Sequence, residues 1–446
     1  MTATDKAPPE GGLSSAPYWW EAAPRPALPD TALPASVDVA VVGSGITGLN
    51  AARVLAAAGR SVLVLEAEVP GHGASSRNAG YVGRTLKWGL LSLIERRGVA
   101  AAVAIYRELR AAYDAVHETV RAEAIDCAFK VCGRYIAANS ARQYDELARE
   151  LAARKQHLGD EFEMVPRSAQ HREIGSELYH GGALIADLAS LDPGQYHLGL
   201  LKSALRSGAA LAANASVEGV HGAAGSFEIV TSRGRFSARD VVIATNGYTG
   251  RAVGWLQRRV VPFDAFMIAT EPLPPERLRR ILPQDRTFLD TNHNINFVRR
   301  SPDGTRLLFG GRTGSRLPTP EAAAARLRRE LARIFPDLKD VELSHSWTGR
   351  CAATFDFFPH MGVHQGIHYA LGYCFAGVPM GTHLGRKVAL KLLGAKEAGS
   401  VFDDRPFPTF PLYNGNPWFV PQLMRGVDLI DRWHSRGHAR ADDLAR

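Results

Sequence analysis

The stretch "VDVAVVGSGITGLNAARVLAAAGRSVLVLEA", residues 37–67, decides the fold of this chain. Its apolar run over 37–42 predicts a buried strand, and the small and apolar residues that follow predict a helix through residue 58. A second apolar run over 61–65 predicts another buried strand. Strand, glycine-rich turn, helix and strand in this order predict the opening βαβ unit of a Rossmann-like α/β domain.

Three glycines between the strand and the helix have the spacing G-x-G-x-x-G: Gly43, Gly45 and Gly48. In a dinucleotide site they permit, in turn, a tight turn, the approach of backbone to a pyrophosphate and close packing of the helix on the strand. Backbone N–H groups at the start of the helix, where Ile46 and Thr47 lie, favour the phosphates. The alternative is a glycine-rich turn with a structural role alone.

An acid, Glu66, ends the second strand, 18 residues after Gly48. A carboxylate at this place accepts hydrogen bonds from ribose hydroxyls and repels the 2′-phosphate of NADP. The motif by itself leaves FAD and NAD open. The segment "GHGASSRNAGYV", residues 71–82, favours FAD, because a loop of small residues lets backbone approach a flat ring closely. An ordinary surface loop is the alternative.

Composition and charge exclude several classes of protein. With 446 residues, 46% of them hydrophobic and 22% charged, the chain predicts a folded protein of two or three domains. Four scattered cysteines exclude a disulfide scaffold or a zinc site and favour a reducing compartment. No signal peptide and no apolar run long enough to span a membrane are recognised, so we expect a cytoplasmic protein. The net charge of +8 is spread along the chain, which argues against nucleic-acid binding.

Six ordered motifs resemble the D-amino-acid-oxidase (DAO) superfamily of FAD-dependent oxidoreductases. They are "DVAVVGSGITGLNAARVLAAAGRSVLVLEA", "GASSRNAGYV", "VVIATNGYT", "RLLFGGR", "WTGRCAATFDFFPHMG" and "YALGYCFAGVPMGTHLGRKVA". Within that superfamily the chain most resembles the amine-oxidising branch typified by gamma-glutamylputrescine oxidoreductase. The resemblance covers about residues 17 to 395.

The resemblance implies a set of FAD-binding residues in this chain. Beyond the glycine turn and Glu66, it places the flavin against the small-residue loop, the adenine at the backbone of one valine, and the closing wall on two later segments. The residues so implied are Ser76, Arg77, Asn78, Ala79, Gly80, Val217, Thr245, Asn246, Gly372, Gly377, Val378, Pro379, Met380 and Gly381. A helix N-terminus in the last segment would stabilise the anionic reduced flavin.

The expected fold class is α/β, with a Rossmann-like FAD-binding domain interleaved with a substrate domain of antiparallel sheet and helices. The expected parts are an extended arm over 1–36; the FAD-binding domain over 37–90, 190–255 and 345–398; the substrate domain over 91–189 and 256–344; and a helical tail over 399–446. The amphipathic pattern of the tail allows a peripheral membrane contact, although packing on the body is the commoner arrangement.

Three departures from family patterns matter. The carboxylate-gripping arginine of glycine oxidase-like members falls here on Cys351, and Arg350, one residue away on a strand, would point to the opposite face. The flavin-tethering cysteine of sarcosine oxidase-like members falls on Gly349, so we expect noncovalent FAD. No lysine lies between Lys202 and Lys339, which leaves oxygen, a quinone or a carrier protein open as the electron acceptor.

Candidate substrate residues come from segments that follow these motifs. His293 could bind substrate or shuttle a proton, and Arg312 could clamp a distant carboxylate. Tyr248, Phe375 and Tyr81 could form pocket walls. Each also has a plain structural alternative: a hydrogen-bonded histidine, an internal ion pair, or core aromatics.

The expected function is oxidation of a primary or secondary amine, an amino acid or a polyamine derivative. A hydride passes to flavin N5, and the resulting imine is hydrolysed. The partners expected are a small amine and oxygen or another electron acceptor, with no nucleic acid, metal or transmembrane segment. The alternatives are an FAD enzyme that acts on a modified tRNA nucleoside and a non-catalytic flavin-binding protein.

Overall fold

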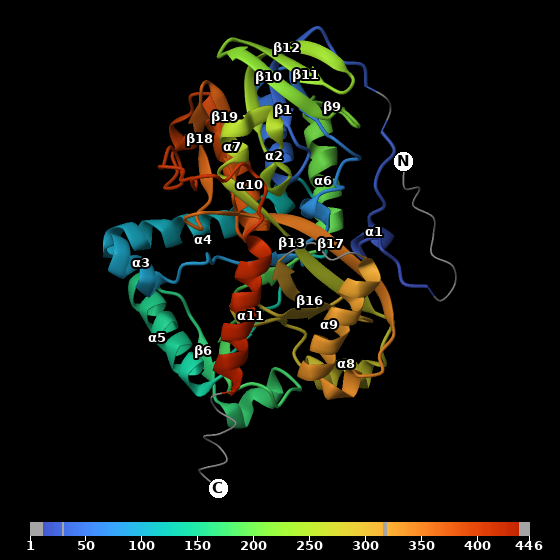
Figure 1. Ribbon diagram of the computed structural model, residues 1–446, viewed down its shortest axis with the longest axis vertical. Helices are drawn as coiled ribbons and strands as arrows, with labels where there is room; N and C mark the ends of the chain where they lie inside the picture. Colours follow the sequence, from blue (N-terminus) through green and yellow to red (C-terminus); the bar gives the residue numbers. More distant parts are fainter. Residues whose placement is uncertain (1–11, 29–30, 315–318, 437–446) are drawn as a thin grey trace.

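The chain folds around two large β-sheets that lie one above the other (Figure 1). The computed structural model describes residues 12–28, 31–314 and 319–436, without the side chains of Arg312 and of residues 432–436. Both sheets draw strands from distant parts of the sequence, which confirms the expected α/β class with interleaved segments.

The first sheet contains the strands predicted from the opening motif. Its main path runs β10 (Val217–Ala223), β11 (Ser226–Thr231), β12 (Gly234–Ile243), β1 (Ser36–Val42), β2 (Val62–Leu65) and β9 (Ala210–Ala212), with β19 (Ile367–Leu371) on β12 and β18 (His360–His364) on β19. The pairs β12–β1, β1–β2 and β2–β9 are parallel, as βαβ crossovers require. The carboxyl ends of these central strands therefore meet at one edge of the sheet.

Four helices cover one face of this sheet or pack on its covering layer: α2 (Ile46–Ala57), α4 (Val99–Ala122), α6 (Pro193–Arg206) and α10 (Gly377–Leu392). Local sequence determines where α6 begins, because the Asp192 side chain accepts from the Gln195 N–H and Pro193 occupies the first turn. Helices α2 and α10 pack closely, and Gly385 of α10 lies against the backbone of Thr47. The start of α2, which carries the nucleotide motif, is therefore packed against α10 as well as against its own sheet.

The second sheet runs β17 (Leu343–Thr354), β13 (Val260–Thr270), β16 (Leu307–Gly314), β15 (Phe297–Arg300), β14 (Thr287–Asp290), β5 (Arg134–Ala137), β7 (Gly182–Ile185) and β6 (Glu163–Val165). Helices α8 (Pro275–Ile281) and α9 (Pro320–Ile334) lie on one face, where they bury an apolar core with Tyr135, Phe288 and Phe309. The opposite face, which carries Leu289 and Phe297, borders a cavity. A small third sheet joins β3 (Tyr81–Val82), β8 (Ala189–Ser190) and β4 (Lys130–Val131).

Several elements differ from the sequence-based expectation. The apolar spacing of the segment after residue 89 is helical throughout. The segment nevertheless forms two helices, α3 (Leu90–Arg97) and α4, because Gly98 has φ +79°. Strand β17 pairs with β13 of the second sheet, although the expected boundary at residue 345 assigned it to the first. The arm contains a short helix, α1 (Trp19–Ala22), with Trp19 fully buried.

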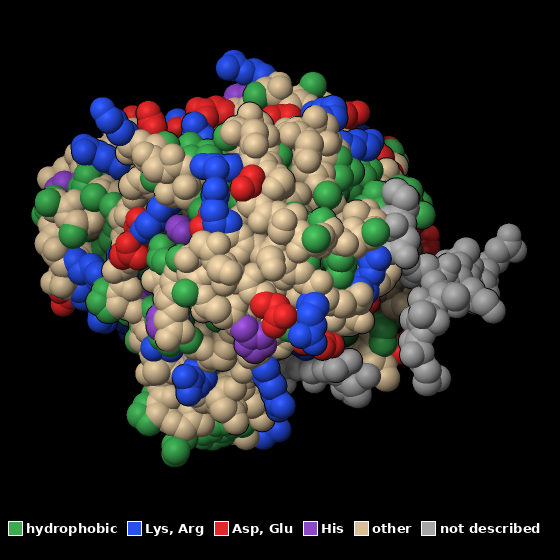
Figure 2. All heavy atoms as spheres, turned by 90° about the horizontal axis from the view of Figure 1, so that it is seen from above, with side chains coloured by type: hydrophobic (Ala, Val, Ile, Leu, Met, Phe, Trp, Pro, Cys, Tyr) green, Lys and Arg blue, Asp and Glu red, His purple; other side chains and the backbone are tan. Residues whose placement is uncertain are grey.

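The tail forms its helix, α11 (Val420–Arg436), only after residue 419, and this helix crosses in front of the second sheet (Figure 1). α5 (Ala141–Leu158) flanks β6. Among the helices of the described residues, none is long and apolar enough to cross a membrane. On the face seen in Figure 2, Lys and Arg side chains are interspersed with Asp and Glu side chains.

Candidate functional site

A single cavity of about 640 Å³ lies between the two sheets. Its wall begins at the glycine turn after β1 and ends at the cavity face of the second sheet, where Leu289 and Phe297 contribute. This volume lies within the range of about 300–1,000 Å³ that small-molecule and cofactor sites occupy. The carboxyl ends of β1 and β2 open into it, which is the usual ligand position in open α/β sheets.

The glycine turn forms a cradle without side chains. Gly43 has φ +101°, a conformation that favours glycine, and its N–H donates to Leu65 O at 2.8 Å. A Cβ on Gly48 would collide with the carbonyl oxygen of Gly43, and one on Gly45 would lie 2.8 Å from Ser75 Oγ. Gly45, the N-cap residue of α2, has no side chain to cap the helix, so the first turn presents backbone N–H donors. This arrangement fits a pyrophosphate.

Glu66 lies at the end of β2, where the sequence predicts a ribose-binding acid. Its Oε2 accepts from the Ser44 N–H at 3.1 Å and from Ser44 Oγ at 2.5 Å. Its Oε1 accepts from the Glu68 N–H at 3.1 Å. Glu66 and Val217 both line the cavity at this end. The carboxylate is held beside the glycine turn, where the sequence predicts an adenosine ribose.

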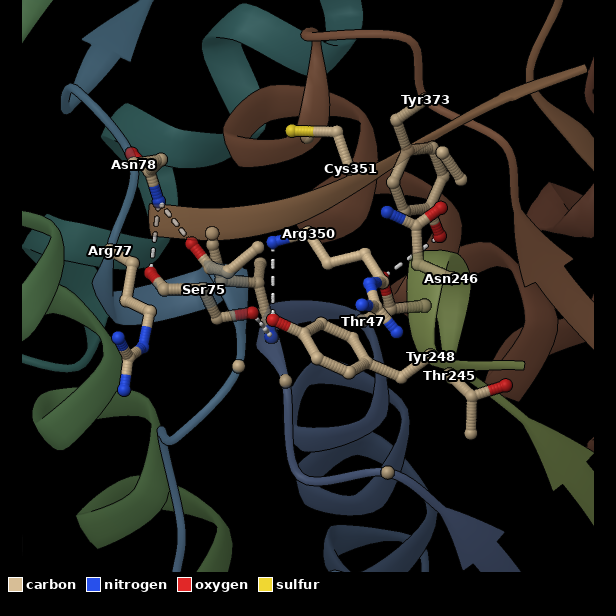
Figure 3. A pocket seen from close by; sticks show the side chains of 18 of the residues that line it. Thr47, Ser75, Arg77, Asn78, Thr245, Asn246, Tyr248, Arg350, Cys351 and Tyr373 are labelled. Carbon is tan, nitrogen blue, oxygen red and sulfur yellow. Dashed lines mark hydrogen bonds between the residues drawn. The ribbon is translucent and has the colours of Figure 1, made fainter. Parts of the chain in front are cut away.

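The small-residue loop forms a second wall. Asn78 fixes the shape of this loop, because its Nδ2 donates to the carbonyls of Ala74 and Ser75 and its Oδ1 accepts from the Gly80 N–H (Figure 3). Ser75 Oγ also accepts from the Ile46 N–H at 3.0 Å, which ties the loop to the start of α2. The sequence-based set omits Ser75, although "GASSRNAG" contains it.

Arg77 leaves the same loop toward the N-terminal arm. Its guanidinium lies 4.6 Å from the ring of Trp20, and its Nε donates to His72 O at 2.6 Å. Trp20 Nε1 in turn donates to Ser76 Oγ at 2.9 Å. The docked arm therefore supports the loop from behind through Trp20.

The facing wall comes from two later segments. Asn246 has φ +42°, and its Oδ1 accepts from the Gly372 N–H at 2.9 Å. The hydroxyls of Tyr373 and Thr47 are 2.8 Å apart, which joins this wall to α2 (Figure 3). The sequence-based set does not include Tyr373, although "YALGYCFAGVPM" contains it. Thr245 lines the cavity beside Asn246.

Helix α10 begins at Gly377, and no side chain caps this N-terminus in the described structure. Gly377, Val378 and Pro379 line the cavity. The backbone N–H groups of this turn are the donors expected near the edge of a flavin.

Some of the expected cofactor residues lie behind the wall instead of on it: Gly48, Ser76, Gly80, Gly372, Met380 and Gly381. Ser76 is fully buried and donates to Gly71 O, and Gly80 packs against the backbone of Leu191. Spacing along a motif does not distinguish a residue that contacts a ligand from one that supports its neighbour.

The predicted substrate residues converge on the end of the cavity near the second sheet. His293, Tyr248, Phe375 and Tyr81 all line it. The buried Tyr81 hydroxyl lies 2.8 Å from both Phe288 O and Val298 O, so the second sheet provides its hydrogen-bond partners. Arg312 belongs to β16, but its side chain lies outside the described part of the structure.

His293 is held by the C-terminal helix. Asp431 of α11 accepts from the His293 backbone N–H at 2.9 Å and lies 2.9 Å from its Nδ1, and it accepts from the Asn294 N–H at 3.0 Å. The His293 side chain is still 49% exposed. A carboxylate at Nδ1 fixes the orientation of the ring. No pattern in the sequence indicates that the tail reaches this loop.

Arg350 and Cys351 leave β17 in opposite directions, as neighbours on a strand do (Figure 3). Arg350 Nε donates to Asp264 Oδ1 at 3.3 Å, and the Arg350 N–H donates to the Tyr248 hydroxyl at 3.2 Å. Burial raises the pKa of the Cys351 thiol to about 12. Cys351 is therefore a neutral thiol and no counter-charge for a carboxylate.

Besides Arg350, two cations on the cavity wall lie outside the sequence-based set. Arg134 of β5 is buried at 4% exposure, and Lys87 donates from Nζ to His293 O at 3.3 Å. Arg134 lies in the alternating segment "FKVCGRYIAAN", but the alternation does not indicate which face of the strand borders a ligand. Only the pairing of β5 with β14 turns it toward the cavity.

Comparison with known proteins agrees with this geometry. Residues 38–390 match the model of the DAO family, described as FAD dependent oxidoreductase. A probable oxidoreductase OrdL of Haemophilus influenzae is 29% identical over 85% of this chain and 87% of its own length. The gamma-glutamylputrescine oxidoreductase of Escherichia coli is 28% identical over 87% of this chain and 91% of its own length.

The fold is similar to the crystal structure of glycine oxidase from Geobacillus kaustophilus, with a TM-score of 0.70 and 22% sequence identity. The match covers 85% of this chain and 99% of that one. The cradle, the acid after β2 and the small-residue loop are the parts that an FAD molecule needs for its pyrophosphate, ribose and ring, so the residues present fit this cofactor.

Proposed function

The chain belongs to the DAO family of FAD-dependent oxidoreductases, and we propose that it oxidises a primary or secondary amine, either an amino acid or a polyamine derivative. Bound FAD supplies the acceptor for the hydride at its N5. The amine carbon loses the hydride and the nitrogen loses a proton. Water then hydrolyses the imine to a carbonyl compound and ammonia or a smaller amine.

One observation carries this proposal: a single cavity connects the nucleotide cradle with the second sheet. A cofactor anchored at Gly43 and a substrate held near Tyr81 and Phe297 would share it. A purely structural flavin protein would need only the nucleotide cradle, whereas this cavity continues to the aromatic and charged side chains of the second sheet, which favours catalysis. The interspersed charges of Figure 2 give no support to a tRNA substrate, which needs a concentrated basic surface.

The expected residue roles follow from the contacts. Backbone N–H groups of α2 bind the pyrophosphate, Glu66 binds the ribose, and the 74–80 loop excludes water from one side of the ring. At the other end Tyr248 and Phe375 enclose the substrate, while His293, oriented by Asp431, is placed to bind it.

Anaerobic mixing of the FAD-loaded protein with a panel of amines tests the proposal. We expect at least one amine to bleach the oxidised flavin spectrum. The rate should rise with pH, because only the neutral amine releases a hydride. Readmission of air, and in a parallel sample a quinone, then identifies the electron acceptor. If no primary or secondary amine bleaches the flavin, the proposed function is wrong.

A further inference from the structure

The charges on the cavity wall are unevenly distributed. Among the lining residues whose side chains the structure describes, the acids are Glu66 and Glu68, and both lie at the nucleotide end. The rest of that wall carries four Lys or Arg residues: Arg77, Lys87, Arg134 and Arg350. An ammonium group would find no carboxylate in this half, whereas an anionic group would be stabilised by the local positive potential.

Three of these cations already have defined partners. Arg77 stacks on Trp20, Arg350 pairs with Asp264, and Lys87 donates to the backbone at the rim. Arg134 is different. Its Nε donates to Thr287 Oγ1 at 3.2 Å and its Nη2 to Val82 O at 3.5 Å, whereas Nη1 has no hydrogen-bond partner among residues 12–28, 31–314 and 319–436. Within the same ranges, no carboxylate pairs with the Arg134 guanidinium.

The neighbouring arginine shows the contrast. Arg84, which is 2% exposed, pairs with both Asp160 and Asp187 at 3.3 and 2.9 Å. Arg134 is 4% exposed and has only neutral oxygens and the ring of Tyr81, whose centroid lies 4.7 Å from Cζ. Burial of a cation without an anion is unfavourable, and burial lowers the pKa of Arg134 accordingly. An anion delivered through the cavity would remove this cost.

The backbone leaves room for such an anion. Gly83 also lines the cavity, and a Cβ built on it would lie 2.7 Å from Arg134 Nη1. Gly83 does not have a positive φ, so its backbone does not require glycine. The missing side chain keeps the unpartnered nitrogen accessible.

We propose that Arg134 of β5 binds a carboxylate of the substrate through Nη1, so that the enzyme acts on an amine that also carries a carboxylate. This inference rests on the proposed function for the reacting group and adds the anionic end of the substrate. The carboxylate is held by the second sheet at β5, on the side of the cavity where Tyr81 and Leu289 lie. On β17, Arg350 is paired with Asp264, and Cys351 beside it is a neutral thiol.

Benzoate and benzamide, which share a shape and differ in charge, are the probes for this site. Titration into the FAD-loaded protein, followed by the change in the flavin spectrum, should show benzoate binding about tenfold or more tightly than benzamide. Arg134→Met should remove this preference while leaving benzamide unchanged. Arg134→Lys should restore part of it, because a charge of similar reach remains.

Gly83→Ala provides a second test that keeps the guanidinium in place. Its new methyl group should displace Nη1 and weaken benzoate binding severalfold, even if Arg134→Met fails to fold. Arg142→Met, an exposed arginine of α5, is the matched control and should behave as the wild type. Equal affinity for the two probes in the wild type, or unchanged benzoate binding in the folded Arg134 and Gly83 variants, overturns the inference.

The amine panel separates this inference from the proposed function. If benzoate binding depends on Arg134 but no amine bleaches the flavin, the anion site stands and the proposed function fails. If amines with a carboxylate and their carboxamide analogues bleach the flavin equally well, the proposed function stands and the Arg134 inference fails.

Discussion

The two ends of the cavity are built in different ways. At the nucleotide end, one contiguous segment supplies the turn, the start of α2 and Glu66, and its strands are neighbours in the first sheet. At the opposite end, Tyr81, Arg134, Leu289, Phe297 and Asp431 come from five elements spread over about 350 residues. Local sequence therefore determines the first end, whereas strand pairing and helix packing assemble the second.

The difference has an electrostatic side as well. The nucleotide end uses backbone N–H groups and a carboxylate, which suit phosphates and ribose hydroxyls. The second-sheet end uses cations and aromatic rings. Damage to the first end should therefore remove the cofactor, and damage to the second should alter substrate binding with the cofactor retained.

Gly48→Ala should have the largest effect. Its methyl group would collide with the Gly43 carbonyl, and overpacking at a buried site costs about 1–3 kcal/mol before any loss of cofactor is counted. We expect the purified variant to lack FAD and to lose more than about 3 kcal/mol of unfolding free energy relative to the FAD-loaded wild type. Flavin absorbance and chemical denaturation measure both quantities.

Gly399→Ala is the control for Gly48→Ala, since among the described residues nothing beyond its chain neighbours lies within 4 Å of the position of its added Cβ. That variant should keep its FAD. A flavin-loaded Gly48→Ala protein of normal stability would contradict the view that the turn is a tightly packed cradle.

The second-largest effect is a pH dependence of protein stability that arises at the nucleotide end. His197 is fully buried, its Nε2 lies 2.8 Å from Ser44 O in the glycine turn, and Arg25 Nη1 lies 3.2 Å from its Nδ1. Burial, followed by the charge of Arg25, lowers the pKa of His197 from 6.5 to about 4. Between these two values the unfolded chain binds a proton that the folded protein resists. The contribution of this histidine is therefore complete above about pH 6.5 and is lost as the pH falls toward 4.

Denaturation at a series of pH values should show this loss as roughly 3 kcal/mol of unfolding free energy by pH 4. His197→Gln keeps a donor for Ser44 O but cannot take up a proton, so its profile should be flatter over this range. The exposed His221→Gln should retain the slope of the wild type. Identical slopes for all three proteins would show that His197 does not carry the effect.

Asp431→Ala should have the smallest effect of the three and should act at the second-sheet end. Its carboxylate holds two backbone N–H groups and the His293 ring, so its loss should cost about 2 kcal/mol. Amide hydrogen exchange should rise in residues 291–296, and the KM for the amine should rise while the FAD content stays unchanged.

Asp114→Ala, which removes an exposed i,i+4 ion pair with Arg110, is the control for Asp431→Ala and should change stability by less than about 1 kcal/mol. Loss of FAD from Asp431→Ala would contradict the separation of the two ends. So would unchanged hydrogen exchange at residues 291–296.

Much of the nucleotide end was predictable from the sequence. The periodicities around Gly43, Gly45 and Glu66 specify a strand, a turn and a helix through interactions between near neighbours in the chain. The ordered motifs also indicated the family and FAD, which the comparisons confirm. Sequence reasoning chose residues such as Ser76 and Gly80 for the wall, whereas the structure places Ser75 and Tyr373 there.

The second-sheet end could not be derived in this way. Whether Arg134 faces a core or a cavity depends on the register of β5 against β14, and a shift of one residue would reverse it. Whether His293 has a partner depends on where α11, more than 120 residues later, comes to lie. The sequence by itself determined the cofactor cradle, because short-range backbone geometry specifies it. Only the tertiary structure decided the charges that meet the substrate, because they arise from long-range packing.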